Sequence, residues 1–204
     1  MFNLVKIVFY FFKRPLKLGN SYFKQLFYFI LLNKINFLKK RIIFSNFPTF
    51  NQSTLCEGKG MVYIGYNCSF GYKLGGFHRG GAIELQARYN EAIIKIGNNI
   101  STNNNIMICA ANYIEIGDDT LIGQYVTIMD FEAHGLNPNK RKVVGEIGKV
   151  IIGKNVWIGN NVIILKNSEI GDNTIIAAGA IVNGKFPANV IIGGIPSKII
   201  KPLP

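Results

Sequence analysis

The sequence predicts an all-β fold, a parallel β-helix built from hexapeptide repeats. The first observation is an aliphatic residue at every sixth position in the second half of the chain: Ile152, Ile158, Ile164, Ile170, Ile176 and Val182. The second is the small residue that often follows it, as at Gly153, Gly159, Gly171 and Ala177. A six-residue period fits neither an α-helix, with about 3.6 residues per turn, nor the alternation of a plain strand. It fits a solenoid that points one aliphatic side chain per hexad into a shared core.

Each hexad is expected to form a short strand followed by a turn, with three hexads in each coil and parallel pairing between coils. The turns favour residues that tolerate a positive φ, which accounts for Asn155, Asn161 and Asn173 beside the glycines. The competing interpretation is a β-sandwich of short strands. Its turns would not recur at so regular an interval.

Residues 1–50 have a different character and are expected to form a helical arm. They hold nine Lys or Arg, no Asp or Glu, and 14 of the 25 aromatic residues of the chain. Pro15 and Gly19 separate two expected helices. The apolar runs at 7–12 and 26–32 are shorter than the roughly 20 residues of a membrane-spanning helix. No small-residue cleavage site follows the first run, so we do not expect a signal peptide.

Two interpretations of this basic, aromatic arm stay open. It can lie on an anionic membrane leaflet through residues 1–50, as a peripheral contact at the inner face. It can instead be a helical cap that buries its aromatic side chains on the solenoid or on a neighbouring subunit. Nucleic-acid binding is not expected, because no recognition motif accompanies the basic residues.

The solenoid domain is predicted at residues 51–193, with two loops. Its first coils, 51–115, are less regular, and the glycine-rich stretch 71–81 within them is expected to be a loop that contains His78. The period also runs through Ile116, Ile122 and Ile128 and then breaks until Ile152, which predicts a charged loop at residues 130–147. Loops that interrupt a solenoid often carry its function. Residues 194–204 leave the repeat and are expected to form a short C-terminal cap.

The cysteines indicate a reducing compartment. Cys56, Cys68 and Cys109 are odd in number and lack metal-ligand spacing. A disulfide framework is therefore not expected, and we predict a cytoplasmic location.

Four motifs accompany the hexads: Ala-His-Gly-Leu-Asn-Pro at 133–138, Asn-Val-Trp-Ile-Gly at 155–159, Ile-Ala-Ala-Gly-Ala at 176–180 and Gly-Ile-Pro-Ser-Lys at 194–198. In this order they resemble the hexapeptide-repeat acetyltransferases of the maltose and galactoside O-acetyltransferase type, with their capsule and lipopolysaccharide relatives. The resemblance covers about residues 96–201. It implies a left-handed β-helix and a homotrimer with active sites between subunits. It also implies transfer of an acetyl group from acetyl-CoA, with no metal required.

This reaction needs a base, because a sugar hydroxyl is a weak nucleophile near neutral pH. Histidine suits the task, since its unperturbed pKa of about 6.5 lies near the working pH. His134 falls where the family has its catalytic histidine, so the resemblance implies that it is the general base. The alternative is an ordinary solvated loop histidine. His78, the other histidine of the chain, is expected to have a structural or acceptor-site role.

The resemblance also assigns binding residues. It places the substrate-binding asparagine of the family on Asn105, although consecutive asparagines can simply build a corner. Asp130 and Glu132 flank the site and are candidates for binding the carbohydrate acceptor or orienting His134; exposed loop carboxylates are the alternative. The residues that match acetyl-CoA contacts are Trp157, Gly159, Asn160, Ala178, Gly179, Lys198 and Lys201. The family often has a lysine at the position of Gly184. Here the lysine is one residue later, so Lys185 is not assigned a contact with CoA.

The predicted function is acetyl-CoA-dependent O-acetylation of a sugar of a surface polysaccharide, such as a capsule or O-antigen, or of its precursor. The alternatives are N-acetylation of an amino sugar and a non-catalytic trimeric scaffold. A γ-class carbonic anhydrase is not expected, because it needs three histidine ligands and the chain has two histidines. A sugar nucleotidyltransferase would need a glycine-rich nucleotide domain, and the first 95 residues contain none.

Overall fold

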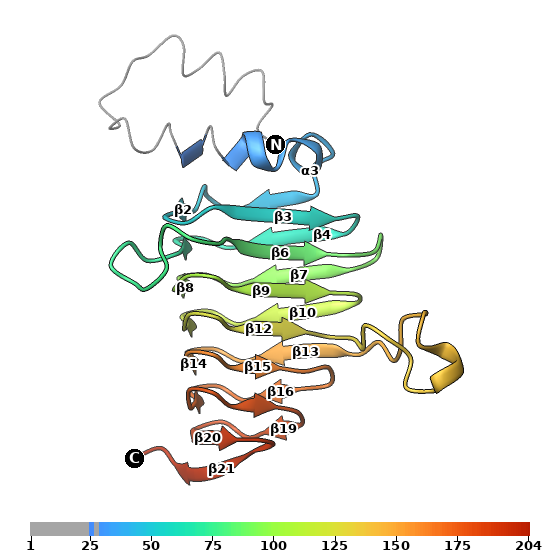
Figure 1. Cartoon of the computed structure of the whole chain (residues 1–204). Helices are drawn as coiled ribbons and strands as arrows, with labels where there is room; N and C mark the ends of the chain where they lie inside the picture. Colours follow the sequence, from blue (N-terminus) through green and yellow to red (C-terminus); the bar gives the residue numbers. More distant parts are fainter. Residues whose placement is uncertain (1–24, 27–28) are drawn as a thin grey trace.

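A computed structural model describes residues 25–26 and 29–204, and in this part the chain winds into a parallel β-helix with three sheets along its axis (Figure 1). Sheet A contains β1 (Ile42–Phe44), β4 (Met61–Ile64), β7 (Ile93–Ile96), β10 (Tyr113–Ile116), β13 (Lys149–Ile152), β16 (Glu169–Ile170) and β19 (Lys185–Phe186). Sheet B contains β2 (Thr49–Phe50), β5 (Ser69–Phe70), β8 (Ser101–Thr102), β11 (Leu121–Ile122), β14 (Trp157–Ile158), β17 (Ile175–Ile176), β20 (Val190–Gly194) and β21 (Ser197–Pro202). Sheet C contains β3 (Thr54–Gly58), β6 (Ile83–Ala87), β9 (Met107–Ala110), β12 (Thr127–Met129), β15 (Ile163–Ile164) and β18 (Ile181–Val182).

The aliphatic residues that recur every sixth position form the core of the β-helix. Successive hexads supply strands of sheets A, B and C in turn, so three hexads close one coil. In parallel register, Ile152 stacks on Ile170 and Ile158 stacks on Ile176. These side chains are buried, and burying an isoleucine contributes about 1.5–3 kcal/mol. The prediction of a parallel solenoid with one aliphatic row per sheet is confirmed.

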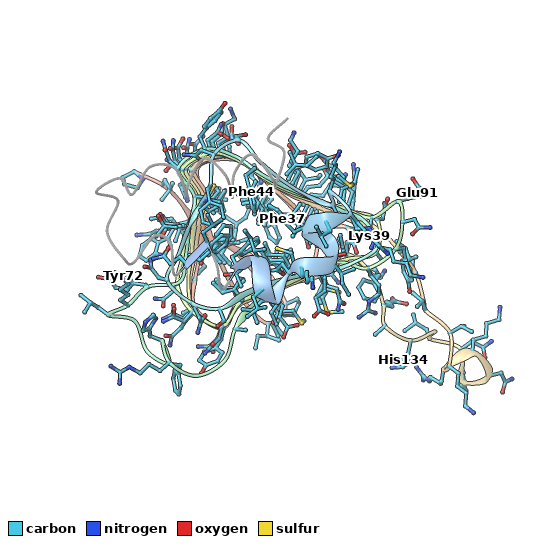
Figure 2. The ribbon with its side chains drawn as sticks, turned by 90° about the horizontal axis from the view of Figure 1, so that it is seen from above. Phe37, Lys39, Phe44, Tyr72, Glu91 and His134 are labelled. Carbon is cyan, nitrogen blue, oxygen red and sulfur yellow. The ribbon has the colours of Figure 1, made fainter. Side chains whose placement is uncertain are left out.

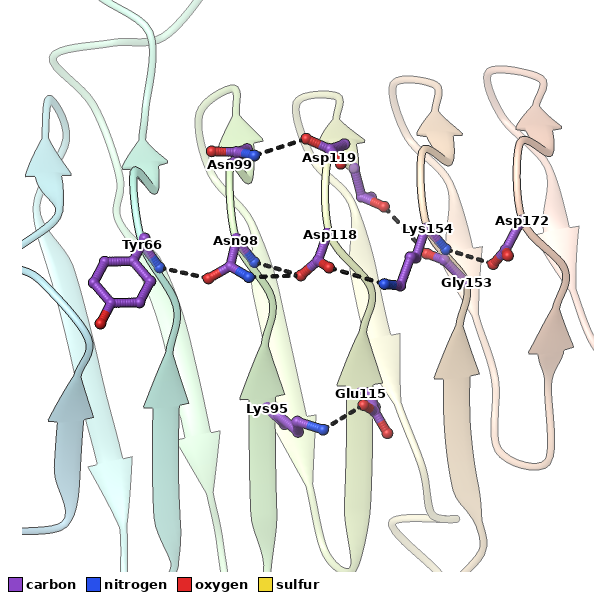
Figure 3. Close-up of polar contacts among 11 residues, drawn as sticks. Tyr66, Lys95, Asn98, Asn99, Glu115, Asp118, Asp119, Gly153, Lys154 and Asp172 are labelled. Atoms are coloured by element: carbon purple, nitrogen blue, oxygen red, sulfur yellow. Dashed lines mark hydrogen bonds and ion pairs between the residues drawn. The ribbon is translucent and has the colours of Figure 1, made fainter.

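The corners use asparagine as predicted: Asn155, Asn161 and Asn173 have φ values of 53°, 58° and 59°. The corner between sheets A and B also carries a polar ladder from coil to coil (Figure 3). Asp118 accepts the backbone N–H of Asn98 at 2.8 Å and pairs with the Lys154 ammonium at 3.1 Å. These two groups hold the pKa of Asp118 below its usual value. The ladder satisfies backbone groups that the corner would otherwise leave without partners.

The solenoid begins before residue 51, so the predicted arm boundary at residue 50 is wrong. β1 pairs with β4, and β2 pairs with β5, as parts of sheets A and B. The six-residue signature is hidden in this first coil because its buried positions include the aromatic side chain of Phe50. The short helix α3 (Lys34–Leu38) precedes it.

Aromatic rings close the N-terminal end of the core. Phe29 is 3 % exposed and stacks on Phe50 with ring centroids 4.3 Å apart, and it meets Phe44 edge to face at 5.6 Å. Asn33 donates from Nδ2 to the carbonyl of Thr54 at 2.9 Å. These contacts support the cap interpretation for the segment from Phe29 through α3, which packs on the first coil. Residues 1–24, which hold the first predicted helix and the Pro15–Gly19 break, lie outside the described residues. No helix in the described part is long and apolar enough to cross a membrane.

At the other end, β21 turns back and pairs antiparallel with β20 at the edge of sheet B. The regular winding therefore ends at Gly194.

The outer faces of the three sheets differ. Sheet A is charged: Lys95 pairs with Glu115 at 2.7 Å, and Lys185 pairs with Glu169 at 2.9 Å. Sheets B and C carry an apolar row over their later coils. The side chains of these rows are Leu121, Trp157, Ile175 and Ile191 on sheet B, and Met107, Ile163 and Ile181 on sheet C, where Thr127 stands between Met107 and Ile163. Trp157 is 56 % exposed in the single chain.

Candidate active site

Two long loops leave the β-helix at different corners. Residues 71–82 connect β5 to β6 between sheets B and C, and residues 130–148 connect β12 to β13 between sheets C and A. Viewed down the axis, Tyr72 marks the first loop and His134 the second, and the two residues lie on opposite sides of the molecule (Figure 2). The break in the hexad period thus located the second loop correctly.

Asp130 anchors the start of the second loop. Its carboxylate accepts the backbone N–H groups of Ala111, Asn112 and Tyr113, at 2.6, 2.9 and 2.6 Å. The residue is fully buried. The prediction that Asp130 binds an acceptor hydroxyl is therefore wrong, because its carboxylate is enclosed and is used to hold the corner of the preceding coil.

The two arms of the loop pair with each other above this anchor. Glu132 donates its backbone N–H to the Glu146 carbonyl at 2.9 Å, and Gly145 donates back to the Glu132 carbonyl at 2.9 Å. The Glu132 carboxylate also lies 3.4 Å from the Lys166 ammonium, which binds Glu146 at 2.6 Å. Lys166 was not predicted, since its role depends on contacts between distant positions. Glu132 remains a candidate for acceptor binding.

His134 lies on the exposed part of this loop, and its backbone contact defines its tautomer. The Nδ1 atom is 2.7 Å from the carbonyl oxygen of Arg141. A carbonyl oxygen can only accept, so the neutral ring carries its proton on Nδ1. The lone pair of Nε2 is then available to take a proton. Sequence reasoning missed the role of Arg141 because a backbone carbonyl leaves no sequence signal.

The residues matched to acetyl-CoA gather on sheet B and on the corner between sheets B and C. Trp157 projects from β14, and the corner that follows contains Gly159 and Asn160. A Cβ on Gly159 would lie 2.6 Å from the backbone nitrogen of Ala178, so the two coils approach closely there. Gly179 has a φ of +74°, and no atom lies within 4 Å of the position that a Cβ would occupy. This part of the corner is therefore open.

The lysines near the C-terminus differ in their environments. Lys198 and Lys201 are exposed on β21, which pairs with β20 of sheet B. Lys185 pairs with Glu169 on the charged sheet A.

Asn105 stands at the same kind of corner, two coils earlier. Its φ is 58°, and its backbone N–H and side-chain Oδ1 both bind the Gln52 amide, at 2.8 and 2.9 Å. Its neighbour Asn104 is fully buried and holds the glycine-rich loop by donating to the carbonyls of Tyr72 and Gly76, at 3.0 and 2.9 Å. The asparagines therefore do more than turn a corner. The structural roles of Gln52 and Asn104 were not predicted.

His78, on the glycine-rich loop, lies away from His134. Its Nδ1 atom is buried and has no hydrogen-bond partner among the described residues.

The described residues provide no evidence for a cysteine nucleophile or a metal centre. Cys56, Cys68 and Cys109 are free thiols, and burial raises the pKa of each, which keeps the thiols protonated near neutral pH. The described chain contains no group of three or more His, Cys, Asp or Glu side chains placed to hold a metal ion.

One chain does not bring the predicted residues into a single site. His134 belongs to the corner between sheets C and A, whereas Asn105, Asn160 and Gly179 lie at the corner between sheets B and C. Sheet C separates these two corners. A reaction centre that uses both sets must combine two chains.

Comparison with known proteins adds relatives and structural neighbours. A family model described as bacterial transferase hexapeptide (six repeats) matches residues 149–184. The putative lipopolysaccharide biosynthesis O-acetyl transferase WbbJ of Escherichia coli (strain K12) is 30% identical over 184 residues, which is 84% of each chain. Galactoside O-acetyltransferase of the same strain is 38% identical over 110 residues, which is 53% of each chain.

Solved structures share the fold. A hexapeptide-repeat acetyltransferase of Vibrio cholerae, in complex with acetyl coenzyme A, superposes with a TM-score of 0.54 at 20% identity, covering 92% of this chain and 80% of that one. A galactoside acetyltransferase in complex with coenzyme A gives a TM-score of 0.53 at 22% identity, covering 98% of this chain and 78% of that one.

Proposed function

The chain belongs to the hexapeptide-repeat acetyltransferases, and from this premise we propose that it transfers the acetyl group of acetyl-CoA to a hydroxyl of a surface polysaccharide or its precursor. The similarity to a protein named for lipopolysaccharide biosynthesis, over 84% of the chain, supports this class of acceptor. The structural observation that carries the proposal is the His134 ring, whose contact with the Arg141 carbonyl leaves Nε2 free to act as a base.

The reaction follows from that geometry. The Nε2 atom of His134 takes the proton of the acceptor hydroxyl while the hydroxyl oxygen bonds to the thioester carbonyl carbon. The tetrahedral intermediate collapses and breaks the carbon–sulfur bond. The proton on Nε2 then passes to the departing CoA sulfur. A positioned general base of this kind contributes about 10²–10⁴-fold to the rate. Bound acetyl-CoA supplies the activated acyl group, and Trp157, Gly159, Asn160, Ala178, Gly179, Lys198 and Lys201 are the residues proposed to hold it.

Acceptor screening tests the proposal directly. The purified full chain is incubated with acetyl-CoA and a panel of methyl glycosides and lipid-linked or nucleotide-linked sugars, and CoA release is followed with a thiol reagent. Product analysis by NMR distinguishes an O-acetyl ester from an N-acetyl amide. We expect an ester. Exclusive amide formation would favour the N-acetyltransferase alternative, and failure to bind CoA at all would favour the scaffold.

We also propose that the active unit is a homotrimer of left-handed β-helices. The apolar rows on sheets B and C support this assembly, since contact with neighbouring chains would remove Leu121, Trp157 and Ile163 from water. Association through these two faces would leave the charged face of sheet A in solvent. A shared site further requires the His134 loop of one chain to reach the B–C corner of another.

If the active sites are shared between chains, co-expression of two inactive variants should restore acetyl-transfer activity. One chain carries His134→Ala, and the other carries Ala178→Trp, which fills the open corner. Light scattering should show a trimer for each. After co-expression in equal amounts, about a quarter of the sites would combine an intact His134 with an intact corner, and activity should return to about that level. Monomers, or mixtures with no activity, would contradict the shared site.

The basic N-terminal arm leads to a second prediction, that it binds the cytoplasmic face of an anionic membrane. Residues 1–24 contain five Lys or Arg and no acidic residue. Each basic residue near an anionic surface contributes about 1 kcal/mol, so binding to vesicles should rise with anionic lipid and fall with salt. Deleting residues 1–24 should abolish vesicle sedimentation while keeping the trimer, because the cap residue Phe29 and the strand β1 are retained. Equal sedimentation of the full and shortened chains would exclude this role.

A further inference from the structure

A pocket of about 480 Å³ lies beneath the glycine-rich loop, at the corner between sheets B and C. Its lining includes Phe77 from the loop, Glu84 from β6, Asn105, Met107 from β9, and Tyr125. Its volume falls in the range of about 300–1,000 Å³ that is usual for small-molecule sites. It lies on the same corner as the proposed acetyl-CoA residues, and three successive earlier coils contribute to its lining.

The loop that forms one wall is held in place by hydrogen bonds. Gln52 reaches the Phe77 carbonyl from Nε2 at 3.3 Å while also binding Asn105. Gly81 has a φ of +92°, and a Cβ there would lie 2.3 Å from the Asn105 Oδ1 atom. The loop can therefore approach Asn105 only because residue 81 is glycine. The pocket is shaped before any ligand enters.

Tyr125 is unusual for its position. It has a φ of 57°, and the corresponding corner residues of the neighbouring coils are Asn105 and Asn161, with φ values of 58° each. Asparagine tolerates this conformation, whereas a bulky aromatic residue adopts it rarely and at a cost. Such a residue at a strained position points to a role beyond the turn itself.

The ring of Tyr125 meets the ring of Phe77 edge to face, with centroids 5.3 Å apart and an interplanar angle of 66°. Both side chains remain substantially exposed, at 38 % and 64 %. Two rings at this angle form an apolar wall on which the C–H face of a pyranose can pack. The Glu84 carboxylate and the Asn105 amide add polar groups for its hydroxyls.

The charges of the pocket select among sugars. Among the lining residues, Glu84 is the one with a formal charge, and none is Lys or Arg. A carboxylate on the sugar would be repelled, and a phosphate would find no cation in the lining. An uncharged sugar or an amino sugar meets neither penalty.

We propose that this pocket is the acceptor subsite, in which Phe77 and Tyr125 hold an uncharged or amine-bearing hexopyranose and Glu84 disfavours acidic sugars. The inference rests on the proposed function and narrows its substrate class. It also supplies three specificity-determining residues beyond Asn105.

The test uses the whole chain and three probes: methyl glucopyranoside, methyl glucosaminide and methyl glucuronoside. Saturation-transfer NMR measures sugar binding whether or not acetyl transfer occurs. Tyr125→Asn restores the residue that suits the corner, so the fold should be kept while the wall is lost. We expect this variant and Phe77→Ala to weaken binding of the uncharged sugar by about 10- to 100-fold, with an unchanged KM for acetyl-CoA. Glu84→Gln should reduce the discrimination against the glucuronoside.

Tyr72→Ala is the matched control, because Tyr72 is an exposed aromatic residue of the same loop that does not line the pocket. It should leave sugar binding unchanged. The inference is overturned if the wild-type protein binds none of the three probes, or if Tyr125→Asn and Phe77→Ala bind the uncharged sugar as the wild type does. The proposed function is judged separately, by CoA binding and by CoA release over the wider acceptor panel.

Discussion

Replacing His134 by alanine should lower kcat by about two to four orders of magnitude, the usual contribution of a positioned general base. The substitution removes the Nε2 lone pair that the contact with the Arg141 carbonyl keeps available. It should leave the proposed trimer and its thermal stability unchanged, because the ring lies on an exposed loop outside the stacked hexads. The dissociation constant of CoA, measured by calorimetry, should also stay within about twofold, since the loss is in the chemical step.

The His134→Gln variant separates loss of the base from loss of the hydrogen bond to the Arg141 carbonyl. Its side-chain amide can still donate a hydrogen bond toward the Arg141 carbonyl, but it cannot accept a proton from a hydroxyl at neutral pH. It should therefore be as inactive as His134→Ala. His78→Ala is the control, since His78 lies on the other loop, and it should reduce kcat far less. Near-normal turnover of His134→Ala, together with an inactive His78→Ala, would show that the base has been assigned to the wrong histidine.

The sequence was a good guide to the fold wherever the core side chains were aliphatic. The period through Ile152, Ile158 and Ile164 predicts the three sheets, because each side chain stacks on the residue one coil away in parallel register. The first coil escaped this reasoning because it uses the buried Phe50 and the partly buried Phe44, whose rings pack against Phe29 from the preceding segment.

The candidate site was only partly predictable. The break in the period located the His134 loop, and the motifs assigned its neighbours by resemblance. The contacts that shape the site involve backbone groups and distant residues, such as the Arg141 carbonyl and the Gln52 amide, which leave no local pattern. Asp130 shows the limit most clearly: a carboxylate at the start of a charged loop suggested a ligand-binding residue, but its partners are three backbone N–H groups of the preceding coil.

Asp130→Ala should therefore be the most destabilising single change considered for this protein. It leaves the N–H groups of Ala111, Asn112 and Tyr113 without the acceptor that a fully buried carboxylate now provides. Each buried donor left without a partner costs about 1–3 kcal/mol, and rearrangement of the corner recovers part of this. We expect a loss of about 3–5 kcal/mol in the free energy of unfolding, measured by urea denaturation at fixed protein concentration.

The matched control for Asp130 is Asp172→Ala. Asp172 also accepts a backbone N–H, that of Lys154 at 2.7 Å, but it is exposed, so water can replace its carboxylate. This variant should lose less than about 1 kcal/mol. Asp130→Asn should fall between the two, since it keeps one acceptor oxygen and turns an amide N–H toward a backbone N–H. Because Asp130 also anchors the loop that carries His134, its variants should lose kcat even at temperatures where they remain folded. If Asp130→Ala is as stable as Asp172→Ala, the three short hydrogen bonds do not hold the corner, and Asp130 would again be open to a role in binding the acceptor.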